Sequence, residues 1–126
     1  MQSKSIEWVL RISVAGEFLG HGIFGLIGKE EWIGWIIQMT GVSPDIATKM
    51  LLFIGMLDIY VALIVLIRPV RVVLLWATFW GFWTAFLRLL VGLPIMDFVE
   101  RSANWGAPLA LLLLIGWPKS WKEWLS

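Results

Sequence analysis

The chain contains no cysteine and only one histidine, His21. Without cysteine it can form neither a disulfide nor a thiol redox centre, and it lacks the thiolates that usually hold an iron–sulfur cluster. A single histidine excludes a haem held by two imidazoles of the same chain. The sequence therefore predicts no metal site.

Charge is also scarce, because 15% of the 126 residues are charged and the formal net charge is +1. A phosphate-binding surface needs clustered lysine and arginine, and here these residues are scattered. No nucleic-acid partner is predicted. Hydrophobic residues, by contrast, make up 60% of the chain and include ten tryptophans, whereas an average soluble domain is about 45–50% apolar. The lipid bilayer is the expected environment.

Four apolar stretches follow one another along the chain. One membrane crossing needs about 20 residues, so the length permits four crossings and leaves no room for a separate soluble domain. We predict a single all-α domain over residues 1–126, an integral membrane four-helix bundle of up-down-up-down topology. The predicted spans are residues 6–27, 44–67, 70–92 and 95–117.

A shorter apolar segment lies between the first two spans. Residues 32–37 are too few to cross a bilayer and are rich in aromatic side chains, which predicts a short helical segment at the membrane interface. Ser43, Pro44 and Asp45 have the character of an N-cap, a first-turn proline and a first-turn acid. The second span is therefore expected to begin at this point.

The last predicted span begins with polar residues. Its purely apolar part, from Trp105 to Trp117, would be only about 20 Å long as a helix, so we expect the helix to begin earlier, near residue 95. Polar side chains at helical spacing then share one face, which should turn toward the bundle or water. These residues are Asp97, Glu100, Arg101 and Asn104.

The positive residues predict the orientation. If both termini share one side with the turn between the second and third spans, that side carries six lysines and arginines against four on the other. The positive-inside rule then predicts a multi-pass protein of the cell membrane with both termini in the cytoplasm.

Polar residues within the spans are the candidate site. Along the first span, small and polar residues recur at helical spacing and predict an inward-facing stripe. The stripe consists of Ser13, Gly16, Glu17, Gly20, His21 and Phe24. The second span contributes Asp58 and the third Arg88. At about 1.5 Å rise per residue, these groups reach similar depth and predict a polar cluster in the outer half of the bundle.

A charge at the centre of a membrane helix costs about 2.5–3.5 kcal/mol, so these carboxyls are expected to be protonated or paired. We predict that Glu17, His21 and Asp58 handle protons. A polar or anionic ligand group is expected to bind at Arg88, Asp97, Glu100, Arg101 and Asn104. Alternatively, the cluster is an ion-pair network that fixes helix register.

Tryptophans form a second candidate feature, on the third span. Trp76, Trp80 and Trp83 stand at i, i+4 and i+7 and share one helix face. Such a row could stack a flat ligand such as a quinone ring. The alternative is ordinary helix packing.

The first span also carries a family resemblance. Gly16-Glu17-Phe18-Leu19-Gly20-His21-Gly22-Ile23-Phe24-Gly25-Leu26, preceded by Leu10-Arg11-Ile12, resembles the opening motif of the DoxX-like membrane proteins, small four-span chains of bacteria and archaea. In that family a lysine commonly follows the His-Gly pair. Here that position is Gly25, and the nearest lysine is Lys29. The resemblance implies membrane redox chemistry, because some relatives are subunits of thiosulfate:quinone oxidoreductase and others accompany secreted sulfur- or superoxide-handling enzymes.

The expected function is therefore that of a membrane redox-associated subunit, quinone-linked, with a membrane or extracytoplasmic partner protein. One alternative is a small proton-coupled transporter that works as a homo-oligomer, for which mid-membrane carboxyls are also expected. Another is a structural or assembly subunit. The first hypothesis predicts a lipophilic pocket that reaches the polar cluster, and the transporter predicts a water path that opens to both sides.

Overall fold

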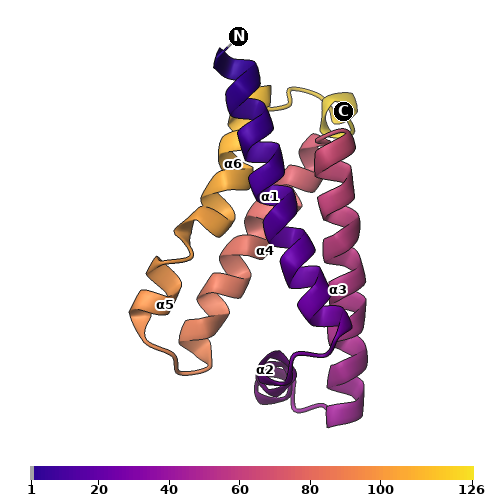
Figure 1. The fold of residues 1–126 in the computed structure, drawn as a ribbon, viewed down its shortest axis with the longest axis vertical. Coiled ribbons are helices and arrows are strands. Elements are labelled where there is room, and N and C mark those ends of the chain that lie inside the picture. Colours follow the sequence, from indigo (N-terminus) through magenta and orange to yellow (C-terminus); the bar gives the residue numbers. More distant parts are fainter. Residues whose placement is uncertain (1) are drawn as a thin grey trace.

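The computed structural model describes residues 2–126, which form seven helices and no strand (Figure 1). The predicted all-α class is confirmed. The helices are α1 (Gln2–Leu26), α2 (Glu30–Thr40), α3 (Pro44–Ile67), α4 (Arg71–Leu90), α5 (Ile95–Val99), α6 (Ser102–Ile115) and α7 (Trp121–Trp124). The start of α3 follows the prediction, because Ser43 Oγ accepts a hydrogen bond from Ile46 N at 3.3 Å and caps the helix.

Three helices of the described chain are long and apolar enough to cross a membrane, namely α1, α3 and α4. They correspond to the first three predicted spans. Most residues in their most apolar windows are not buried inside the protein. Exposed apolar faces of this extent are typical of helices that contact lipid.

The fourth predicted span is not one helix. It is divided into α5 and α6 by a turn at Glu100 and Arg101, so the expectation of a continuous helix over residues 95–117 is wrong. The Arg101 side chain explains the interruption: its Nη1 donates to Asp97 O at 2.8 Å, while Arg101 N bonds Phe98 O at 3.1 Å instead. With 14 residues, α6 is about 21 Å long.

The four long elements form two pairs. α1 packs extensively on α3 and α4 on α6, whereas α3 and α4 touch over a short stretch. Figure 1 shows the two pairs converging at the end that carries both chain termini, here called the terminal end, and diverging toward the other end, where α2 lies across the bundle. We call this second end the α2 end.

A hydrophobic core fills the terminal end. Its largest fully buried side chains come from all four long elements and include Val14, Phe18, Val65, Leu74 and Leu111. Between helices in lipid, close packing rather than the hydrophobic effect supplies most of the attraction. The tight core therefore holds the two pairs together at this end.

Glycines bring the helices of each pair into close contact. A Cβ atom added at Gly55 of α3 would lie 2.7 Å from Gly22 O of α1, and one added at Gly25 would lie 2.8 Å from Gly55 Cα. In the other pair, a Cβ at Gly81 of α4 would collide with Asn104 O of α6. Small residues permit such backbone-to-backbone approach in membrane proteins.

The buried face of α1 differs from the predicted stripe. Ser13, Gly16 and Phe24 are exposed, so the prediction that they face inward is wrong. The buried face instead consists of Arg11, Val14, Ala15, Phe18, Gly22 and Gly25. The reason is that the crossing with α3 uses Gly22 and Gly25, which turns the predicted stripe away from the core and leaves Glu17 and His21 half-buried at its edge.

Two arginines cap helix ends at the terminal end. Arg11 is buried; its Nε donates to Val65 O at 3.1 Å, its Nη2 donates to Leu66 O, and its Nη1 pairs with Glu7 at 3.2 Å. Arg71 caps the end of α6 in the same way, because its Nε donates a hydrogen bond to Gly116 O at 2.7 Å. The last carbonyls of a helix have no intrahelical partner, and these guanidinium groups supply one.

Substitution of Arg11 by methionine is expected to lower the unfolding free energy by about 1–3 kcal/mol, because the buried carbonyl of Val65 and the partly buried carbonyl of Leu66 lose their donor. Arg68→Met, which removes an exposed arginine at the same end of α3, is the matched control and should have a small effect. The measurement is unfolding of both variants in detergent micelles by titration with SDS. Equal stability of the two variants would show that the cap contributes nothing.

Candidate functional site

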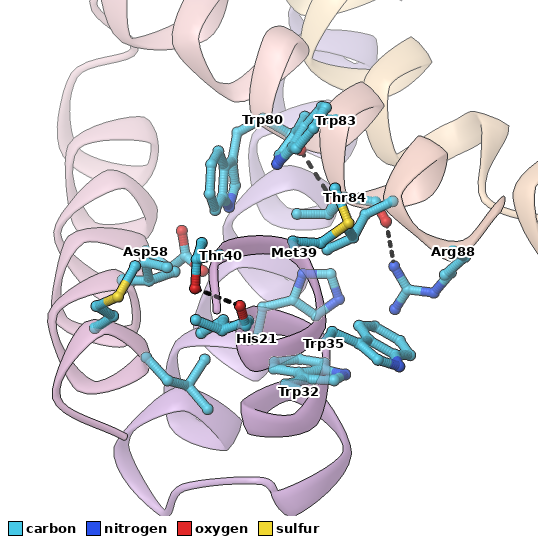
Figure 2. A pocket seen from close by; sticks show the side chains of 15 residues that line it. His21, Trp32, Trp35, Met39, Thr40, Asp58, Trp80, Trp83, Thr84 and Arg88 are labelled. Carbon is cyan, nitrogen blue, oxygen red and sulfur yellow. Dashed lines mark hydrogen bonds between the residues drawn. The ribbon is translucent and has the colours of Figure 1, made fainter. Parts of the chain in front are cut away.

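A pocket lies at the α2 end, between α1, α2, α3 and α4 (Figure 2). Its volume is about 240 Å³, and most of its lining is apolar. Four tryptophans and two methionines dominate the walls: Trp32, Trp35, Trp80, Trp83, Met39 and Met50. Sites for drug-sized ligands are about 300–1,000 Å³, so this pocket suits the ring of a ligand whose chain leaves through the opening.

The helix α2 supplies one wall of the pocket. Glycines in left-handed conformation flank it, Gly28 with φ 71° and Gly41 with φ 74°, and Gly41 N bonds Ile37 O at 2.8 Å to close its last turn. These two turns fold α2 back across the gap between the diverging pairs. The pocket therefore depends on the chain reversals at both ends of α2.

Two ionisable residues reach the pocket from facing helices. Asp58 of α3 is 3% exposed and Arg88 of α4 is 5% exposed. Arg88 Nη1 donates to Thr84 O at 2.6 Å, and its Cζ lies 5.0 Å from the Trp35 ring centroid. Among residues 2–126, Asp58 Oδ1 and Arg88 Nε have no hydrogen-bond partner, and the two side chains do not pair with each other.

Unpaired polar atoms of this kind are costly. A buried donor or acceptor without a partner costs about 1–3 kcal/mol, and native proteins contain few of them. A third unpaired atom, Trp32 Nε1, also belongs to a pocket residue. Three of the five buried side-chain atoms without a partner in the described chain thus belong to residues of this pocket, and the other two, Trp76 Nε1 and Trp105 Nε1, lie outside its lining.

His21 enters the pocket from α1. Its ring meets the Trp32 ring edge to face, with centroids 5.5 Å apart and an interplanar angle of 88°. Lys29 Nζ lies 4.7 Å from the same Trp32 ring centroid, and the charges of Arg88, Arg101 and Lys29 all act on His21. Three positively charged side chains therefore lie within electrostatic range of the imidazole.

The structure brings together five of the residues that the sequence singled out. They are His21, Asp58, Trp80, Trp83 and Arg88. Glu17 does not line the pocket, but it is half-buried on α1 within electrostatic range of Asp58. Trp76 lies outside the lining: it stacks on Trp80, with centroids 5.4 Å apart and planes at 16°, and packs against the core.

The polar residues of the α5–α6 segment do not line the pocket. Arg101 Nη1 pairs with Glu100 Oε1 at 2.8 Å, and the backbone of Asn104 packs against Gly81. Asp97 and Glu100 nevertheless lie close enough for their charges to act on Arg88. Asp97 and Glu100 therefore contribute to the electrostatic field at the pocket although they do not line it.

Sequence reasoning missed the contribution of α2. The aromatic residues Trp32 and Trp35 were predicted to lie at the membrane interface. Both line the pocket, together with Ile36, Met39 and Thr40. The five positions recur at i, i+3, i+4, i+7 and i+8, the spacing of one apolar helix face. This periodicity could have predicted that α2 packs against the other helices, because an apolar face on a short helix with polar flanks needs a surface to pack against.

Within the described chain, no group of three histidine, cysteine, aspartate or glutamate side chains is arranged to hold a metal ion.

No protein-family model, curated protein or solved structure matches the chain.

Proposed function

We propose that the protein is a four-span, multi-pass protein of the cell membrane that binds a flat lipophilic ring of the quinone class in this pocket and acts as a redox-associated subunit. The observation that carries the proposal is the tryptophan-lined cavity with buried, unpaired Asp58 and Arg88 in its walls. Apolar walls with a few convergent polar groups are the usual form of a small-molecule site.

The walls and the polar groups suit different parts of such a ligand. Tryptophan faces stack on flat rings, and Trp80 and Trp83 present theirs to the cavity (Figure 2). Ring oxygens would meet the hydrogen-bonding groups of Asp58, Arg88 and Trp32. The exposed apolar faces of α1, α3 and α4 support access by a lipid-soluble molecule.

Proton handling follows from the same arrangement. A quinone takes up protons together with electrons, and groups within hydrogen-bond reach of the ring must supply them. His21 and Asp58 line the pocket, and Glu17 of α1 lies within electrostatic range of Asp58. We assign these three residues to proton exchange with the bound ring.

The electrons are assigned to a membrane or extracytoplasmic partner protein. The resemblance of residues 10–26 to the DoxX-like opening motif supports this assignment, because some members of that family are subunits of a quinone-linked oxidoreductase. In the proposed topology, α5 and α6 form the interrupted fourth crossing, both termini are cytoplasmic, and the pocket lies in the outer half of the bundle.

A proton-coupled transporter fits the geometry less well. Alternating access needs a central site that can open to both sides. At the terminal end, Phe18, Leu74 and Leu111 are fully buried and fill the space between the helix pairs. The pocket thus lies next to a packed core rather than on a path through the bundle.

A substitution that fills the pocket tests the proposal. Ile54→Trp adds a bulky ring to the lining, and we expect it to raise the dissociation constant for a decyl-substituted benzoquinone at least about tenfold, a loss of about 1.4 kcal/mol. Binding is measured by equilibrium dialysis of the detergent-purified protein.

The matched control is Ile67→Trp, on the same helix at a position that is 79% exposed, which should bind like the wild type. No binding by the wild type, or equal binding by the pocket-filling variant, would overturn the proposed function.

A further inference from the structure

We propose that the pocket binds the reduced ring, a hydroquinone, more tightly than the quinone, with one hydroxyl donating to Asp58 and the opposite hydroxyl bound between Arg88 and Thr84. This inference rests on the proposed quinone-class ligand and specifies which form of it the site selects. The argument depends on the direction of each hydrogen bond that the walls can make.

The first wall, on α3, offers an acceptor in the carboxylate form of Asp58. Asp58 Oδ1 is buried without a hydrogen-bond partner in the described chain. A quinone oxygen can only accept, so it can meet Asp58 only after the carboxyl has taken up a proton. A hydroquinone hydroxyl brings its own hydrogen and can donate it to Asp58 directly.

The facing wall, on α4, offers a donor and an acceptor side by side. Arg88 is held by Thr84 O and by the Trp35 ring, and a guanidinium group only donates. The Thr84 hydroxyl directs its own hydrogen at Trp80 O and Gly81 O, at 3.0 and 3.2 Å. Its lone pairs therefore remain to accept a hydrogen from the ligand.

The first wall thus favours a ligand group that donates, and the second favours a group that accepts from Arg88 and also donates to Thr84 Oγ1. A hydroxyl at the second wall can accept from Arg88 and donate to Thr84 Oγ1, whereas a quinone carbonyl can only accept from Arg88. Figure 2 shows Asp58 on one side of the pocket and Thr84 and Arg88 on the other. The two hydroxyls of a hydroquinone stand at opposite ends of the ring, so that one can face each side of the pocket.

The test compares three probes on the wild-type protein in detergent under argon: decyl-hydroquinone, the corresponding quinone, and the hydroquinone dimethyl ether, which keeps the ring oxygens but cannot donate. Equilibrium dialysis is expected to show the hydroquinone bound about tenfold or more tightly than either other probe, the effect of a hydrogen bond to a charged group. This comparison needs no variant and so does not depend on how a substitution folds.

The variant Asp58→Asn tests the role of the carboxylate in this preference. The asparagine amide can donate to a quinone carbonyl, so the preference for the hydroquinone should fall below about threefold or reverse. Asp45→Asn, the same change at an exposed position of α3, should keep the wild-type preference.

The outcomes separate the two proposals. If the wild type binds the quinone or the dimethyl ether as tightly as the hydroquinone, the selection of the reduced form is overturned while the ring-binding function stands. If none of the three probes binds, the proposed function itself fails, and this inference fails with it.

Discussion

Replacement of Gly55 by alanine is expected to push α1 away from α3 and to lower the unfolding free energy by about 1–3 kcal/mol, the usual range for overpacking. The added Cβ would lie 2.7 Å from Gly22 O and 3.0 Å from Leu26 N. Both are backbone atoms, so no side-chain rotation can relieve the contact. Unfolding by SDS titration in micelles, followed by far-UV circular dichroism, measures the loss.

Gly16→Ala provides the control for this prediction. Gly16 also lies inside a long helix, but apart from its chain neighbours and the nearby backbone of its own helix, no described atom lies within 4 Å of a Cβ built there. Alanine is favoured over glycine in a helix interior by about 0.5–1 kcal/mol, so this variant should be as stable as the wild type or slightly more stable. If both alanine variants behave alike, the close crossing of α1 and α3 is not what holds the pair together.

Replacement of Arg88 by glutamine is expected to weaken ring binding by about tenfold to a hundredfold, because hydrogen bonds to charged groups contribute about 1.5–3 kcal/mol. The quinone and the hydroquinone should both lose affinity, since each accepts from Arg88. Arg88→Lys should give an intermediate loss, because lysine keeps the charge without the planar group that lies over Trp35. Equilibrium dialysis with the same probes gives the affinities.

The comparison variant is Arg101→Gln. The sequence placed Arg101 among the ligand-binding candidates, whereas the structure places it outside the pocket lining, paired with Glu100. Partly exposed pairs of this kind contribute little, and the expected change in affinity is below about threefold. A loss as large as that of Arg88→Gln would place the ligand beside α5 instead of under α2.

Local signals account for the start of α3, which the sequence predicted correctly, and for the choice of Asp58 and Arg88 as candidate residues. Ser43 and Pro44 mark the start of α3 because capping involves residues a few positions apart. Asp58 and Arg88 stood out because charged side chains within apolar spans are rare and usually functional. Neither inference required knowledge of which helices are neighbours.

The incorrect predictions depended on packing and side-chain contacts that residue patterns alone do not reveal. The first span has small residues on more than one face, and its buried side is decided by Gly55, which lies on a different helix and meets Gly22 and Gly25. The interruption between α5 and α6 depends on the Arg101 side chain competing for a backbone carbonyl. α2 can fold back across the bundle only because the two helix pairs diverge and leave space there, which the sequence of α2 does not show.

Because the helix pairs diverge at one end only, the two ends of the protein differ: one holds the pocket and the other the packed core. In a bilayer, the proposed crossing would place the pocket within one leaflet, while the packed terminal end would occupy the other. A ring dissolved in the opposite leaflet must first cross the membrane midplane before it can bind. Occupancy of the site would therefore follow the ligand content of a single leaflet rather than that of the whole membrane.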